Sequence, residues 1–189
     1  MSQNKTASNV SRPNSQARTR KLAVIGMSAA VISVLAQISL PLGPVPVTLQ
    51  TFALALTACV LGPTQGFAGA AVYLLCGAAG LPVFAGFSGG PSALFGYSGG
   101  FLWTFPAMSL LCGFSCRVRR PFRLLPPLAG LFICHLGGAV QYSALAGIPL
   151  AAGAMAVSIP YLIKDILSVL LALYLAAKVR NALIKSGLL

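Results

Sequence analysis

Acidic side chains are almost missing from this chain of 189 residues. Asp165 is its only Asp or Glu, and charged residues of all kinds make up 7% of the sequence. A soluble domain usually carries about 25% charged residues. This chain therefore has too few polar side chains to cover a water-facing surface. The composition excludes an ordinary soluble domain and indicates that the protein is surrounded largely by lipid.

Motifs for metal binding, disulfide formation and nucleotide hydrolysis are also missing. The five cysteines form no Cys-x-x-Cys pair and lie within apolar segments, which disfavours a zinc site or a disulfide framework. The phosphate-binding motif Gly-x4-Gly-Lys-Ser/Thr is absent from the sequence, so we expect no ATP hydrolysis by this chain itself. The single histidine, His135, has no carboxylate near it in sequence, and we interpret it as a packed helix residue. We expect no catalytic residues, no metal and no cofactor.

Long apolar runs dominate what is present. Hydrophobic residues make up 57% of the chain, and the mean hydropathy is +0.88. Apolar stretches of roughly 20 residues fit helices that cross a hydrocarbon core of about 30 Å, where the backbone must satisfy its own hydrogen bonds. Proline and glycine clusters divide the chain into six such segments, at about residues 22–40, 47–61, 65–81, 100–116, 127–147 and 159–179. The segment 47–61 is short for a span, so it either extends into its flanks or lies within protein.

The basic residues predict how these helices are oriented. Thirteen Lys and Arg give a net charge of +12, and most of them fall into clusters at the N-terminus, at residues 117–123 and near the C-terminus. Each cluster flanks an apolar segment, so the positive-inside rule explains them better than nucleic-acid binding does. With six helices, all three clusters lie on the cytoplasmic side. We predict an all-α integral membrane protein with six transmembrane helices and cytoplasmic N- and C-termini.

Three regions follow from this assignment. Residues 1–21 are polar and lack apolar periodicity, which predicts a disordered basic cytoplasmic tail. A signal peptide is the competing interpretation, but the apolar segment 22–40 is longer than the usual apolar region of about 7–15 residues. Residues 22–180 form the six-helix membrane domain, and residues 181–189 form a short cytoplasmic tail.

The lone carboxylate interrupts the last apolar segment, in the stretch "SIPYLIKDILSVLL" at residues 158–171. One interpretation is structural: Lys164 reaches the outer headgroups and Asp165 favours the positive end of the helix dipole. The other is functional, because an ionisable residue within a membrane helix marks a substrate or ion path. The absence of other acids favours the second. Since adjacent helix positions point about 100° apart, we expect no usual ion pair here but a donor and an acceptor for separate parts of a ligand.

Further polar residues gather on the same predicted outer side of the membrane. A pocket with few charges and many hydrogen-bonding groups suits a small, mostly neutral organic molecule. For each residue alone, packing between helices is the alternative role. The candidate ligand-binding residues in this group are Thr48, Gln50, Ser88, Gln141 and Tyr142.

Small residues recur on the first apolar segment. Gly26 and Ala30 are four positions apart, and so are Ala29 and Ser33. This spacing allows close approach of another helix. The second helix belongs either to this chain or to a partner subunit that docks at the cytoplasmic end.

Several segments resemble one known family. The stretches "ISLPLGPVPVTLQTF", "GLPVFAGFSGG" and "GGFL", together with Asp165 in the last helix, resemble BioY proteins, the biotin-specific substrate-binding subunits of energy-coupling-factor vitamin transporters. The resemblance covers about residues 20–180. It implies a six-helix subunit of a prokaryotic cytoplasmic membrane that captures biotin from outside with high affinity. It also implies a transmembrane coupling subunit and two cytoplasmic ATPases as partners, with docking on the small residues of the first helix.

The end of the chain departs from the family pattern. That pattern is commonly Pro-aromatic-x-x-Gly-Asp-x-x-Lys, and Pro160, Tyr161 and Asp165 match it. Lys164 occupies the glycine position, and Ser168 occupies the lysine position. The resemblance therefore carries Asp165 over, whereas Lys164 is a displaced substitute for the family's lysine.

Biotin as the ligand gives each candidate residue a chemical role. Asp165 is expected to accept from the ureido N–H groups, and Thr48 or Gln50 to donate to the ureido carbonyl. Lys164 is expected to pair with the ligand carboxylate, and Phe84 to cover the ring. In the opposite orientation of the ligand, which the sequence leaves open, these roles are exchanged. The alternatives are a solitary carrier without ATPase partners, a related vitamin such as thiamine or riboflavin, and a membrane-embedded enzyme. The enzyme is disfavoured because the chain has one carboxylate, one histidine and no metal motif.

Overall fold

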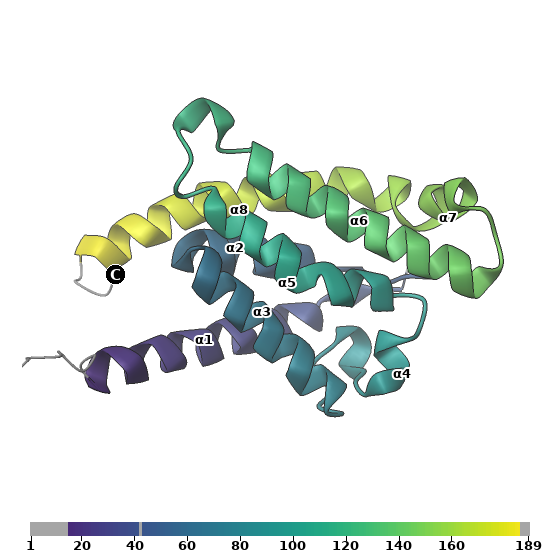
Figure 1. Cartoon of the computed structure of the whole chain (residues 1–189), viewed down its shortest axis with the longest axis horizontal. Helices are drawn as coiled ribbons and strands as arrows, with labels where there is room; N and C mark the ends of the chain where they lie inside the picture. The colour runs from purple at the N-terminus through teal and green to yellow at the C-terminus, as the bar shows by residue number, and fades with distance from the viewer. Residues whose placement is uncertain (1–14, 42, 186–189) are drawn as a thin grey trace, which may run out of the picture.

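The computed structural model describes residues 15–41 and 43–185, and this part of the chain is folded mainly into helices (Figure 1). The predicted all-α fold class is confirmed. Two short 3-10 helices, η1 (Ala85–Phe87) and η2 (Arg120–Phe122), and one two-stranded hairpin accompany eight α-helices. The α-helices are α1 (Ser15–Ala36), α2 (Gln50–Leu61), α3 (Pro63–Ala78), α4 (Pro91–Leu94), α5 (Gly99–Phe114), α6 (Leu125–Ala146), α7 (Leu150–Val157) and α8 (Ile159–Lys185).

Each of the six predicted apolar segments corresponds to a helix, namely α1, α2, α3, α5, α6 and α8. The two outer ends of the chain differ from the prediction. Helix α1 begins at Ser15, so residues 15–21, which were assigned to a disordered tail, are helical. Helix α8 continues to Lys185, so most of the predicted C-terminal tail is helical as well. The rest of both predicted tails, residues 1–14 and 186–189, lies outside the described residues.

The junction between α1 and α2 is a hairpin, and it includes residues 39–40 and 47–48, which were predicted to lie in the flanking helices. Strand β1 (Ser39–Leu40) pairs antiparallel with strand β2 (Val47–Thr48), and Ser39 lies opposite Thr48. Prolines within residues 41–46 lack the N–H that a helix needs and force the chain to turn. As a result Thr48 lies in a strand directly before α2.

Residues 148–158 were predicted to be an outer connection, but they contain α7. Helix α6 ends at Gly147, whose φ of 66° places it in the left-handed region that glycine adopts readily. Pro149 then precedes α7, which packs against α6 and meets α8 at a bend of 52°. Eight residues are too few to cross a membrane, so the apolar pattern that identified the other helices did not identify this one.

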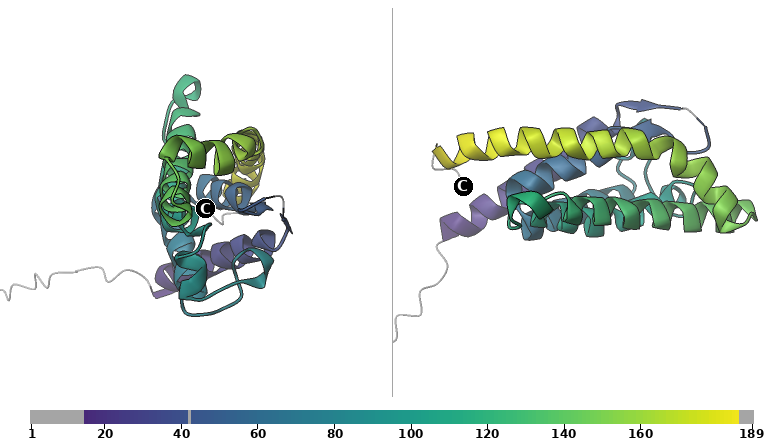
Figure 2. Two further views of the ribbon diagram at one scale, coloured as in Figure 1. Left: turned by 90° about the vertical axis from the view of Figure 1, so that its right-hand side faces the viewer. Right: turned by 90° about the horizontal axis from the view of Figure 1, so that it is seen from above.

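Helix α2 lies at the centre of the molecule and is enclosed by α1, α3, α5 and α8 (Figure 2). Nine of its 12 residues are buried. Small residues such as Ala53, Ala55 and Ala58 are fully enclosed and let the neighbouring helices approach closely. The predicted segment 47–61 was short either because it extends into its flanks or because it lies within protein. The structure shows the second, because α2 lies within protein.

The outer helices expose apolar side chains. Phe132 on α6 and Ile163 on α8 are 68% and 72% exposed, and a water-soluble protein rarely exposes a large continuous apolar surface. By length and composition, α1 and α6 can each cross a membrane, and the bent pair of α7 and α8 is a third candidate span. The count of six spans therefore stays a prediction.

The two ends of the molecule differ in the segments they carry. The start of α1, the end of α8 and the loop around η2 lie at one end in Figure 1. Helix α4 and the turn between α6 and α7 lie at the opposite end. The site described next is built near the second group of segments.

Candidate functional site

A cavity of about 260 Å³ lies between the start of α2, the loop around η1 and the first turns of α5. Its size is near the lower end of ligand pockets, which range over roughly 300–1,000 Å³. Ser88 lies at its exposed side, where the hydroxyl donates to the carbonyl of Ala85 at 2.8 Å. The lining combines aromatic rings with a few polar groups and includes Gln50, Phe84, Ser88, Ser98, Phe101 and Phe105.

Phe84 forms a fixed wall of this cavity. Its side chain is 1% exposed, and its ring packs edge-on against Tyr73 with 5.4 Å between the ring centroids. A Cβ atom at Gly77 would lie 2.0 Å from the Phe84 ring, so this ring needs a glycine beneath it. Gln37 holds the loop from the other side: its Nε2 donates to the Phe84 carbonyl at 3.1 Å, and its Oε1 accepts from the Phe87 N–H at 2.9 Å.

Gln50 is the buried polar group of the cavity. Its Oε1 accepts from the Thr48 hydroxyl at 3.0 Å, and its Nε2 donates to the Tyr73 hydroxyl. A primary amide carries two N–H donors, so these bonds orient the side chain and leave one donor for a ligand. The structure brings Gln50 to the cavity as predicted, whereas the Thr48 hydroxyl is engaged in orienting Gln50.

The lone carboxylate lies in a cluster of partners from different elements. Asp165 is 6% exposed, and its Oδ1 contacts the Lys164 ammonium. The same ammonium donates to the Thr48 carbonyl at 2.9 Å. On the other side, His135 Nε2 lies 3.2 Å from Asp165 Oδ2. The cluster joins α8 to α6 and, through Lys164, to strand β2.

One prediction about this cluster is wrong. Lys164 and Asp165 were not expected to pair, but the flexible lysine stem bends back and brings the two charges together despite their different directions from the helix. His135 is a packed helix residue, as interpreted, but the sequence did not reveal its contact with the carboxylate. It faces Asp165 because α6 and α8 pack together, and its distance from Asp165 in sequence concealed this. The available signal was that one acid and one histidine, both in apolar helices, each needed a polar partner.

Two other predicted ligand residues support the outer loops. Gln141 Nε2 donates to the carbonyls of Leu94 at 2.9 Å and Gly96 at 2.8 Å, which accounts for both amide hydrogens. Gln141 therefore fixes the segment after α4 and does not line the cavity. The ring of Tyr142 packs against Tyr97 with 5.4 Å between centroids and is likewise outside the cavity.

The small residues of α1 divide between two faces. Ala29 is buried, and the half-buried Ser33 donates its hydroxyl proton to the Ala29 carbonyl at 2.8 Å. Gly26 and Ala30 are exposed. Beside them an apolar groove of about 460 Å³ runs between α1, α2 and α8, and its lining includes Met27, Val31, Leu56, Val60 and Val179.

Metal binding finds no structural support in this part of the protein. Within residues 15–41 and 43–185, no three His, Cys, Asp or Glu side chains come together in a way that could hold a metal ion.

Comparison with known proteins agrees with this architecture. The sequence model of the BioY family matches residues 5–185. A probable biotin transporter BioY of Pyrococcus horikoshii is 34% identical over 164 residues, which are 87% of this chain and 98% of that protein. The biotin transporter BioY of Thermotoga maritima is 44% identical over 121 residues, which are 63% of this chain and 72% of that protein.

A solved structure shares the fold. The crystal structure of the S-component for biotin from an ECF-type ABC transporter superposes with a TM-score of 0.79 at 23% identity, over 90% of this chain and 95% of that one. The apolar helices and the transporter relatives together identify an integral membrane protein. Because the family match covers nearly the whole chain, the protein belongs to the BioY family.

Proposed function

We propose that the chain captures biotin with high affinity and acts as the substrate-binding subunit of an ATP-driven energy-coupling-factor transporter. One observation carries the proposal: a chain of contacts links the cavity to the lone carboxylate, although Asp165 does not itself line the cavity. Lys164 contacts Asp165 and bonds the backbone of Thr48, and the Thr48 side chain bonds Gln50 in the cavity. The names of the relatives, all of them biotin transporters, favour biotin as the ligand and transport over catalysis.

The chemistry of biotin matches this site group by group. The ureido ring has two N–H donors and one carbonyl, and the free donor of Gln50 suits that carbonyl. The rings of Phe84 and Phe101 flank the cavity and suit the apolar bicyclic body. Asp165 suits the ureido N–H groups, and Lys164 suits the ligand carboxylate.

Binding both ends of the ligand requires a movement. Because Lys164 and Asp165 are in contact, they cannot serve separate ends of a ligand in this arrangement. The side chain of Lys164 is 29% exposed against 8% for Asp165, and its four-carbon stem is flexible. Lys164 therefore leaves Asp165 when the ligand carboxylate arrives, and the carboxylate of Asp165 stays in place as an acceptor.

The exposed face of α1 suits a partner subunit. Gly26 and Ala30 let a second helix approach closely, and the adjacent apolar groove can receive its side chains. We assign this face to a transmembrane coupling subunit that works with two cytoplasmic ATPases. Ala29 and Ser33, which turn toward the molecule's own core, support α1 from inside.

The orientation in the membrane belongs to the same proposal. The basic residues that the structure describes at the N-terminus lie on α1, and the other two clusters lie in the loop around η2 and at the end of α8; these segments lie toward one end of the molecule (Figure 1). The positive-inside rule assigns that end to the cytoplasm of a prokaryotic cell. The protein then crosses the cytoplasmic membrane several times, and its ligand site opens outward.

Uptake by living cells tests the transport function. Cells that produce this chain with a coupling subunit and two ATPases should accumulate labelled biotin, and excess thiamine or riboflavin should not compete. Depletion of ATP should abolish accumulation, and the tagged chain should co-purify with the ATPases. Undiminished uptake without the ATPases would support a solitary carrier. Accumulation of thiamine or riboflavin in place of biotin would refute the assigned ligand.

A further inference from the structure

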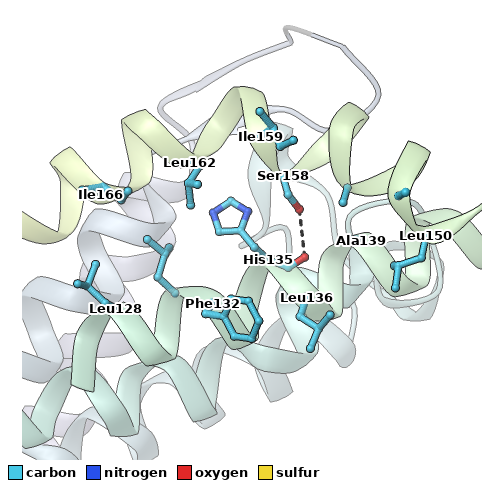
Figure 3. A pocket seen from close by; sticks show the side chains of 13 residues that line it. Leu128, Phe132, His135, Leu136, Ala139, Leu150, Ser158, Ile159, Leu162 and Ile166 are labelled. Atoms are coloured by element: carbon cyan, nitrogen blue, oxygen red, sulfur yellow. Dashed lines mark hydrogen bonds between the residues drawn. The ribbon is translucent and has the colours of Figure 1, made fainter. Parts of the chain in front are cut away.

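His135 has no role in the function proposed so far, yet it occupies a position that the site depends on. It projects from α6 between two features: a lateral groove between α6, α7 and α8, and the Asp165 carboxylate. Figure 3 shows its ring among Leu162, Ser158 and Phe132, with the His135 carbonyl accepting from the Ser158 hydroxyl at 3.1 Å. The side chain is almost completely buried, and among the described residues neither ring nitrogen has a well-aligned hydrogen-bond partner, although Nε2 lies 3.2 Å from Asp165 Oδ2.

The contact with Asp165 fixes the donor of the ring. An ionised carboxylate only accepts hydrogen bonds, so the nitrogen that faces it, Nε2, carries the proton. The ring itself is held edge-on against Phe101, with 5.8 Å between centroids, and Phe101 also lines the ligand cavity. His135 thus places a ring nitrogen beside the carboxylate and connects it to the wall of the cavity.

Lys164 and His135 differ in how freely they can leave Asp165. Lys164 approaches Oδ1 on a flexible stem and is the more exposed of the pair, whereas His135 approaches Oδ2 from inside the helix packing. The Thr51 side chain is a further, neutral donor to the carboxylate. A buried carboxylate that loses a charged partner is destabilised unless other donors remain, and His135 is the remaining group that faces Oδ2.

We propose that His135 is a positioning residue of the ligand site, which holds Asp165 Oδ2 so that Lys164 can leave Oδ1 and pair with an anionic end of the ligand. The inference rests on the proposed function, because it takes the ligand to be a carboxylate with N–H donors. Without His135, Lys164 stays on Asp165. The site then loses its preference for a charged ligand over a neutral one.

The test compares biotin with biotinamide, in which a neutral amide replaces the carboxylate. Both are titrated into the detergent-purified full chain, its His135→Phe, His135→Gln and His135→Asn variants, and a control, Phe132→Leu, which changes the same groove without touching Asp165. The unmodified protein should favour biotin by about tenfold or more, as a charge-assisted bond predicts. His135→Phe should bring this ratio close to one. His135→Gln, whose amide N–H can occupy the place of Nε2, should retain most of it.

The remaining variants separate positioning from folding. His135→Asn keeps a polar side chain that is too short to reach Asp165, so it should behave like His135→Phe and serves in its place if the aromatic variant does not fold. In a Lys164→Met background, replacing His135 should leave the ratio unchanged. Equal losses for biotin and biotinamide in His135→Phe and His135→Asn, or no loss in either, would overturn the inference. Failure of the unmodified protein to bind biotin would instead refute the proposed function.

Discussion

Asp165 organises the site at the scale of single residues. Its carboxylate is the one negative side chain of the protein, and it gathers Lys164 and His135 from two helices. A buried charge is tolerated only when it is paired and hydrogen-bonded. The cost of keeping such a group in an apolar interior argues for a function beyond helix packing.

Replacing Asp165 should weaken biotin binding more than replacing Lys164. Asp165→Asn removes a charged acceptor, which contributes about 1.5–3 kcal/mol, and leaves the buried His135 and the part-buried Lys164 poorly paired. We expect roughly a ten- to hundredfold or greater loss of affinity. Lys164→Met should cost less, because Lys164 is the more exposed partner. Biotin titration of both purified variants gives the affinities.

Thermal unfolding of the two variants is the control for folding. If Asp165→Asn folds and binds biotin like the unmodified protein, the carboxylate makes no ligand contact. Its place near the start of α8 then reflects only the helix dipole and the reach of Lys164 toward the headgroups.

Gly77 should matter through the aromatic ring that lies above it. Gly77→Ala suits a helix, but the added Cβ would lie 2.0 Å from the ring of Phe84 and push it into the cavity. Overpacking typically costs about 1–3 kcal/mol of folding stability, and the displaced ring should also lower the affinity for biotin. Gly26→Ala is the matched control, because nothing lies within 4 Å of its new Cβ. Equal biotin affinities in the two variants would show that Phe84 does not shape the site.

At the scale of elements, helix α1 uses one face to support the fold and the opposite face for the proposed docking of a partner subunit. Its inner face packs against α3, where the Ser28 side chain fills the space that Gly69 leaves. Its outer face carries Gly26 and Ala30 beside an open apolar groove. One helix can therefore stabilise the fold and receive a partner, because the two tasks use opposite faces.

A bulky residue at Ala30 should impair uptake and spare ligand binding. Ala30→Leu adds volume where a partner helix must approach, and it lies away from the cavity. Ala152→Leu makes the same change at an exposed position on α7 and should leave uptake unchanged. Uptake of labelled biotin and titration of the purified chain separate the two effects. Loss of biotin binding in Ala30→Leu would mean that Ala30 supports the fold.

The sequence predicts the long helices of this fold better than their connections. Apolar runs between proline and glycine clusters identify α6 and α8 because these helices must satisfy their own backbone in lipid. The hairpin before α2 and the short α7 could not be found in that way, since they depend on local turns and on packing against neighbours. The same limit applies to the site. Gln50 was found from its polarity, whereas the contact of His135 with Asp165 arises only when α6 and α8 pack together.

For the whole molecule, the proposed orientation can be tested by labelling. Ser92 and Arg119 are both exposed and lie in the proposed outer and inner loops. Each is replaced by cysteine in a chain whose five native cysteines have been removed. A membrane-impermeant thiol reagent added to intact cells should label Ser92→Cys and leave Arg119→Cys unlabelled until the membrane is opened. The reverse pattern would place the cavity on the cytoplasmic side.

The central claim concerns the whole protein as a receptor for one ligand. Equilibrium titration of the detergent-purified chain with biotin, thiamine and riboflavin in turn tests it most directly. The chain of contacts from Gln50 through Thr48 and Lys164 to Asp165 predicts saturable binding of biotin at a single site. It predicts no binding of thiamine or riboflavin at the concentrations that saturate with biotin. Comparable binding of all three vitamins, or no binding of biotin by the folded protein, would contradict the account.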